Sequence, residues 1–203
     1  MARSRFRLLA AGLASGCALL AGGTAGAAPL PVTTCLGTTA QAFLFAQDTS
    51  GYTLAPGGSF ESGAAGWTLA GGAATAAGNE PWYVNAPTDS RSLALPAGSS
   101  ATTPSVCVGA LDATIRFFAS GPATTGSSLR VSVAFTLLGQ KVTMPVGTLK
   151  GTGAWQASAA IPFLANVLSL FTASGTSQVA FQFSALSGNW RIDDVYVDPL
   201  KHK

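Results

Sequence analysis

The chain has 203 residues, of which 48% are hydrophobic and only 9% are charged, with 24 glycines and 11 prolines. Its formal charge of +3 comes from Arg3, Arg5 and Arg7, because the rest of the chain holds equal numbers of basic and acidic residues. No basic stripe remains, which argues against nucleic acid as the partner.

The N-terminus has the pattern of a secretory signal peptide, 1–27. The three arginines precede an apolar run, Leu8–Leu20, and small residues follow it up to a cleavage site after Ala27. A retained membrane anchor would need about 20 apolar residues, and this run is shorter and interrupted by glycine. Cys17 offers the alternative of a lipoprotein box. We expect a secreted protein with no membrane span in the mature chain.

Residues 28–57 form the next predicted segment, an N-terminal arm that contains Cys35. In an exported chain the two remaining cysteines, Cys35 and Cys107, most simply form one disulfide. Closing a loop of about 70 residues would stabilise the fold by about 4 kcal/mol in the chain-entropy model. Free buried thiols are the alternative.

Short strands separated by frequent turns predict a single all-β sandwich. Leu129–Phe135 shows the clearest alternation of apolar and polar residues. One short helix is expected at Phe163–Phe171, after Pro162. The expected strands are Gly66–Leu69, Trp82–Val84, Ser92–Leu95, Ser105–Val108, Thr114–Ala119, Leu129–Leu138, Lys141–Thr148, Ala154–Ile161, Gln178–Ser184 and Trp190–Val197.

Two motifs resemble the opening and closing strands of galactose-binding-like jelly-roll modules, which often bind carbohydrate beside secreted hydrolases. The early motif is G-x-F-E-x-G…G-W, within Gly58–Trp67, and the late motif is I-D-D-V-x-V, within Trp190–Pro199. The resemblance implies a jelly-roll β-sandwich over 58–199, leaving 200–203 as a tail.

That resemblance also implies one structural Ca²⁺ joining the first strand to the last. Its side-chain ligands would be Glu61 and Asp193, since hard cations prefer oxygen. If Asp193 shares a strand face with Val195 and Val197, it points inward, where a carboxylate needs a partner. A salt bridge from Asp193 to Arg116 or Arg191, or solvation at a rim, is the alternative.

The candidate ligand site combines aromatic and polar side chains in one short stretch. Sugar rings present apolar C–H faces, which exposed aromatic rings recognise beside amides and carboxylates. Trp82 and Tyr83 would face opposite ways on a strand, so one of them would be exposed; a buried strand is the alternative. The proposed ligand-binding residues are Asn79, Glu80, Trp82, Tyr83, Asn85 and Arg116.

Catalytic residues are scarce. The one histidine, His202, is next to the C-terminus, which excludes Ser-His-Asp and Cys-His arrangements and histidine-based metal sites. We therefore expect a monomeric, non-catalytic module that binds carbohydrate or a cell-surface ligand. The alternatives are a structural or interaction protein of the cell envelope and, more remotely, a glycoside hydrolase using an acid pair.

Overall fold

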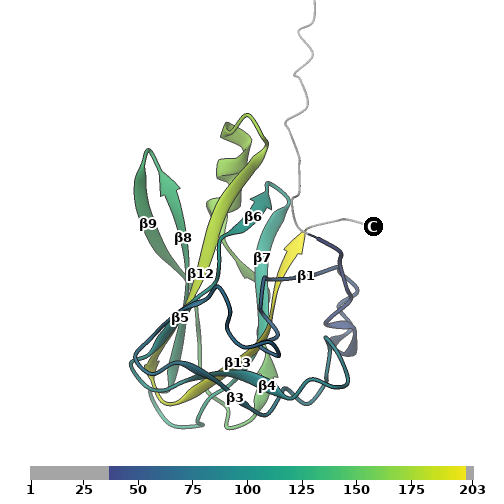
Figure 1. Cartoon of the computed structure of the whole chain (residues 1–203), viewed down its shortest axis with the longest axis vertical. Helices are drawn as coiled ribbons and strands as arrows, with labels where there is room; N and C mark the ends of the chain where they lie inside the picture. The colour runs from purple at the N-terminus through teal and green to yellow at the C-terminus, as the bar shows by residue number, and fades with distance from the viewer. Residues whose placement is uncertain (1–36, 200–203) are drawn as a thin grey trace, which may run out of the picture.

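The computed structural model describes residues 37–199 and shows two antiparallel sheets packed face to face (Figure 1). The expected all-β sandwich is confirmed. The signal peptide, Cys17, Cys35 and the tail 200–203 lie outside the described residues, so the Cys35–Cys107 disulfide stays a prediction.

One sheet, which we call the seven-stranded sheet, has the strand order β10-β7-β13-β4-β3, with β1 also paired to β13 and β11 to β7. Its strands are β1 (Thr53–Leu54), β3 (Ala74–Ala77), β4 (Arg91–Leu95), β7 (Asp112–Ser120), β10 (Trp155–Ala157), β11 (Ile161–Pro162) and β13 (Trp190–Pro199).

The six-stranded sheet has the order β2-β5-β12-β8-β9, with β6 also paired to β12. Its strands are β2 (Thr68–Ala70), β5 (Ser100–Thr102), β6 (Val106–Gly109), β8 (Ser128–Leu137), β9 (Gln140–Leu149) and β12 (Thr176–Ser187). The chain crosses between the sheets repeatedly, from β7 to β8 and from β12 to β13, as a jelly roll does.

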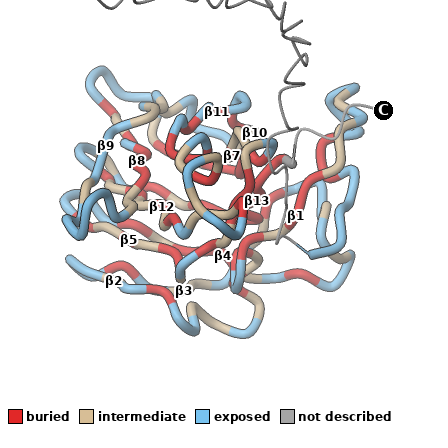
Figure 2. Tube along the Cα trace, turned by 90° about the horizontal axis from the view of Figure 1, so that it is seen from above, coloured by how far each residue is buried: buried red, intermediate tan, exposed pale blue. Residues whose placement is uncertain are grey.

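The core fills the space between the sheets, where Figure 2 shows the buried stretches of the strands. Alternating side chains of the long strands point into it, because successive residues of a strand face opposite ways. Its largest fully buried members are Phe60, Leu93, Leu95, Phe117, Phe163, Phe181, Phe183 and Trp190.

The helical prediction is confirmed as a 3-10 helix, η2 (Leu164–Phe171), with Phe163 as its N-cap residue. No helix of residues 37–199 is long and apolar enough to cross a membrane. Two strand predictions were wrong: Trp82–Val84 forms a turn, with Tyr83 at φ 50°, and Ala154–Ile161 divides into β10 and β11. Sequence reasoning missed β1, β3 and β5.

The arm packs against the outer face of the seven-stranded sheet. β1 pairs with β13, and a second apolar cluster joins Phe43 and Tyr52 of the arm to Phe118 and Tyr196 of the sheet. Phe43 stacks on Phe118, with their ring centroids 5.2 Å apart. The sheet is therefore covered on both faces, so side chains that alternation alone would expose are buried.

Gly121 tests the packing at the end of β7. A Cβ atom there would lie 2.5 Å from the buried ring of Trp190. We expect Gly121→Ala to destabilise the protein by about 1–3 kcal/mol, since a filled core resists an added methyl group. Urea unfolding measures the change. Gly37→Ala, where no described residue other than the chain neighbours lies within 4 Å of the added Cβ, is the control and should have almost no effect.

Candidate functional site

The loop of residues 78–90, here called the acidic-side loop, is fixed at both ends. The carbonyl oxygen of Gly78 accepts a hydrogen bond from the Arg191 guanidinium at 2.9 Å. At the other end, the backbone N–H and the hydroxyl of Ser90 donate to the Glu61 carboxylate at 2.9 and 3.3 Å. Such closure explains how a segment without regular structure holds its side chains in place.

Glu80 organises the loop from inside. It is fully buried, and its carboxylate accepts the backbone N–H groups of Trp82 and Val84, the latter at 2.8 Å. Its own backbone N–H donates to Asp193 at 3.3 Å. Burial raises the pKa of the Glu80 carboxyl, and the N–H bonds offset part of that shift. Glu80 is thus held by the loop and cannot reach a ligand.

Three aromatic side chains on this side are exposed: Phe45 at 45%, Trp82 at 38% and Tyr83 at 49%. We call them the aromatic platform. Phe45, from η1 (Leu44–Ala46), stacks on Trp82 with ring centroids 4.8 Å apart, and both rings lie against buried Phe118. Tyr83 makes no ring contact within the described part of the chain, so its ring is the most available.

The two asparagines of the predicted site differ. Asn79 is half-buried and donates to the carbonyl oxygen of Glu80 at 3.0 Å. Asn85 is exposed and donates to Asp89 at 2.8 Å, which leaves its side-chain carbonyl free to accept from a ligand hydroxyl. Asn85 is therefore the better placed of the two.

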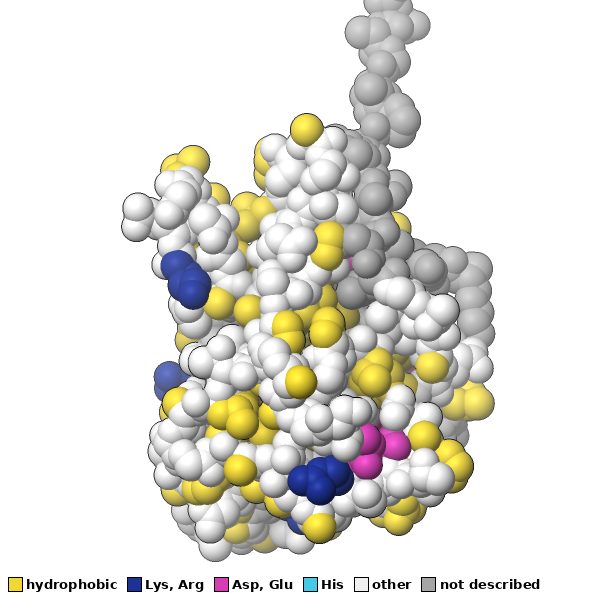
Figure 3. Space-filling model, in the orientation of Figure 1, with side chains coloured by type: hydrophobic (Ala, Val, Ile, Leu, Met, Phe, Trp, Pro, Cys, Tyr) yellow, Lys and Arg dark blue, Asp and Glu magenta, His cyan; other side chains and the backbone are white. Residues whose placement is uncertain are grey.

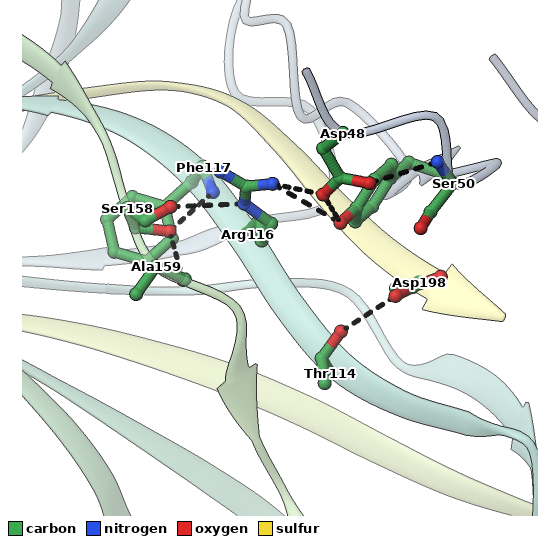
Figure 4. A network of polar contacts seen from close by, with 9 residues as sticks. Asp48, Ser50, Thr114, Arg116, Phe117, Ser158, Ala159 and Asp198 are labelled. Atoms are coloured by element: carbon green, nitrogen blue, oxygen red, sulfur yellow. Dashed lines mark hydrogen bonds and ion pairs between the residues drawn. The ribbon is translucent and has the colours of Figure 1, made fainter. Parts of the chain in front are cut away.

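Arg116 belongs to a buried network that ties the arm to the sheet (Figure 4). Its Nη1 pairs with Asp48 and donates to the Tyr52 hydroxyl, and its Nε donates to the Ser158 carbonyl at 3.1 Å. The guanidinium carbon lies 3.8 Å from the centre of the Phe43 ring. With these donors engaged internally, Arg116 is not kept in the binding site proposed below.

A bulge in β13 brings Asp193 and Asp194 beneath the acidic-side loop. Asp193 pairs across the sheet with Phe118 on the outer face, and after the bulge Val197 pairs with Ile115 on the inner face. The expectation that Asp193 shares a face with Val197 was wrong, because Asp194, at φ 43°, inserts one residue.

Asp194 is the least compensated charge of the described region. It is 1% exposed, and neither of its carboxylate oxygens has a hydrogen bond of normal geometry. Burial, followed by the charges of Glu80 and Asp89, raises its pKa to about 8; the nearby N–H of Asn85 opposes this only in part. Burial and the neighbouring Asp194 likewise raise the pKa of Asp193 to about 9.

The surroundings of Asp193 and Asp194 fit a bound cation better than a salt bridge. The side-chain bonds of Arg116 and Arg191 go to groups other than Asp193. Within residues 37–199, no three acidic, histidine or cysteine side chains form a ready-made metal cluster. Calcium also uses backbone carbonyls, so the buried oxygens of Asp194 are the observation that favours it.

The two predicted ligands already have internal partners. Each Asp193 oxygen accepts a backbone N–H, and Glu61 accepts from Ser90 and Arg91. Their roles as ligands stay predictions. Sequence reasoning did not name Asp194 or Phe45 as site residues. The adjacent acids in a chain poor in charge were the available signal for Asp194.

No protein-family model and no curated protein matches the chain. Among solved structures, it is similar to the family 22 carbohydrate-binding and catalytic modules of a Clostridium thermocellum xylanase bound to xylohexaose. The identity is 15% and the TM-score 0.48, over 68% of this chain and 27% of that chain. This chain thus spans about a quarter of that structure.

Two isolated binding modules are also similar. One is a xylan-binding domain of a Paenibacillus barcinonensis xylanase, at 16% identity and TM-score 0.44, covering 71% of this chain and 93% of that one. The other is a family 61 module bound to β-1,4-galactotriose, at 16% identity and TM-score 0.38, covering 70% and 94%. At these identities and TM-scores, the ligands of those modules are not assigned to this chain.

Proposed function

We propose that this chain is an exported, non-catalytic module that binds carbohydrate on the aromatic platform. The observation that carries the proposal is the exposure of Trp82 and Tyr83 on a loop whose backbone is fixed by the buried Glu80. A platform held in advance loses little entropy on binding. Its rings suit the apolar face of a sugar, and the free carbonyl of Asn85 suits a hydroxyl.

Calcium is the second part of the proposal. Asp193 and Asp194 of the β13 bulge, with Glu61 from the turn before β2, would hold the ion together with backbone carbonyls. The ion would supply positive charge to the buried acids and link β13 to the loop that carries the platform. Its role is structural, and no step of ligand binding requires it.

Binding is favoured over glycoside cleavage by the position of the acids. The exposed fraction is at most 1% for each of Asp193, Asp194 and Glu80. An acid pair that cleaves a glycosidic bond has to flank the bond directly, and these carboxylates have no access to a polysaccharide chain.

Tyr83→Ala and Trp82→Ala test the platform. Each is expected to weaken polysaccharide binding about tenfold. The reason is that stacking of a planar ligand face on an aromatic side chain contributes on the order of 1–3 kcal/mol. Tryptophan-fluorescence titration against a panel of neutral polysaccharides and oligosaccharides measures binding, with affinity electrophoresis for the Trp82 variant.

Phe171→Ala is the matched control, since that ring is 85% exposed but belongs to η2. It should leave binding unchanged. A flat response of the unmodified protein to the whole panel, or equal losses in Phe171→Ala and Tyr83→Ala, would refute the proposed platform. The protein would then be better considered as an interaction protein of the cell envelope.

A further inference from the structure

The six-stranded sheet carries an unusual distribution of charge. None of its strands contains Asp or Glu, and its only charged residues are Arg130 in β8 and Lys141 in β9. The chain has no acidic residue between Asp112 and Asp193. Figure 3 shows basic but no acidic side chains over the β8–β9 side, whereas the visible acids gather elsewhere. This sheet therefore offers positive charge that no nearby carboxylate neutralises.

Both basic side chains lie on the outer face of the sheet. In β8, Leu129, Val131 and Val133 are buried in the core, so Arg130 alternates outward. Lys141 of β9 pairs with Thr136 of β8. Thr136 lies six residues after Arg130, on the same face of β8. Both side chains are exposed and donate no hydrogen bond to any described residue.

A hollow of about 300 Å³ opens beside Lys141. Its floor includes Ala180 and Ala134, which pair directly across β12 and β8. Small side chains in this row leave space between longer neighbours. The side chains of Thr102, Thr136, Lys141 and Gln178 line the hollow.

The polar groups of the hollow are mainly donors. The amide oxygen of Gln178 already accepts the Ser105 hydroxyl at 2.9 Å, which leaves its NH₂ group free to donate. Lys141 adds three N–H donors and a positive charge. No carboxylate and no exposed aromatic ring lines the hollow. A donor-rich, positively charged site is complementary to a carboxylate and is poorly suited to stacking a neutral sugar.

We propose that this outer face is a second carbohydrate site, separate from the aromatic platform, and that it binds an acidic polysaccharide. One sugar carboxylate would occupy the hollow against Lys141 and Gln178. Arg130 lies about 20 Å further along β8 at strand spacing, so a second carboxylate of the same polymer would reach it. Between the two cations, the amide of the half-buried Gln182, which pairs with Ser132, would meet the sugar hydroxyls.

The test uses polygalacturonate as the probe, with its fully methyl-esterified form as the neutral counterpart. Affinity electrophoresis and titration calorimetry of the full mature chain should show binding of the acidic polymer that weakens with salt, and much weaker binding of the ester. Lys141→Gln should reduce affinity about fivefold, and Gln178→Glu by more, because it places a carboxylate in the hollow.

Lys150→Gln removes an exposed lysine that does not line the hollow and should leave affinity unchanged. Tyr83→Ala should also bind polygalacturonate normally, which separates this site from the platform. Three results would overturn the proposal: no binding at low salt, equal binding of acid and ester, or equal losses in Lys141→Gln and Lys150→Gln. Poly-glutamate binding as tightly as polygalacturonate would overturn the assignment to a polysaccharide.

Discussion

Without calcium, the protein is expected to be markedly more stable at about pH 5 than at about pH 8. The cause is the raised pKa of Asp193 and Asp194 in the folded state. The folded chain holds these protons over a pH range in which the unfolded chain has released them. The associated stability is complete below the ordinary Asp pKa and is lost as pH rises toward the folded values of about 8 and 9.

The expected size of this loss is large for a single domain. One group that is protonated when folded and ionised when unfolded changes the free energy of unfolding by about 1.4 kcal/mol per pH unit. Between about pH 5 and about pH 8 one such group accounts for on the order of 4 kcal/mol, and the two acids together for more. Urea unfolding in chelator at several pH values measures it.

Added Ca²⁺ should remove most of this pH dependence, because a bound cation favours the ionised carboxylates. At 100 times its dissociation constant, calcium would add about 2.7 kcal/mol at neutral pH. Asp194→Asn should lose this gain and, in chelator, be at least as stable as the unmodified protein near pH 8. A curve that is flat with pH and insensitive to calcium would contradict both the buried charge and the metal site.

The regular part of the fold was predictable because its signals are local. The alternation in Leu129–Phe135 placed β8 in the correct phase, and Pro162 marked the start of η2. The missed strands β1, β3 and β5 have two to four residues each, largely Ala, Ser and Thr. Such segments become strands through pairing with longer neighbours, which a local pattern does not show.

The candidate site was predictable in composition and not in geometry. One of Trp82 and Tyr83 was expected to be exposed on a strand, but both are exposed, because their backbone is an irregular segment held by the buried Glu80 carboxylate. Asp194 was missed because a bulge changes which face a residue occupies, and nothing in I-D-D-V-x-V marks where the extra residue falls. The arm also covers the outer face of β13, so outward residues that alternation alone would expose, such as Asp193 and Tyr196, are buried.

Arg116→Met is expected to destabilise the protein by about 3 kcal/mol, the second large effect. The side chains of Arg116 and Asp48 are 11% and 25% exposed, so removing the cation leaves a poorly hydrated carboxylate beside Tyr52. The Ser158 carbonyl also loses its donor, and the Phe43 ring loses the guanidinium that covers it. Urea unfolding gives the change in free energy, with Arg130→Met as the exposed control of matched size and an expected change below about 0.5 kcal/mol.

The pH dependence of this variant distinguishes lost pairing from lost packing. Burial alone would raise the pKa of Asp48, but hydrogen bonds from Tyr52 and Ser50 and the charge of Arg116 lower it overall. Stability from the ionised Asp48 is therefore present above its ordinary pKa and disappears as pH falls through the lowered value. The unmodified protein and Arg116→Met should converge in stability on acidification if the ion pair is what the substitution removes. A difference that persists unchanged at low pH would instead assign Arg116 a packing role over Phe43, and the arm would be held by its apolar cluster alone.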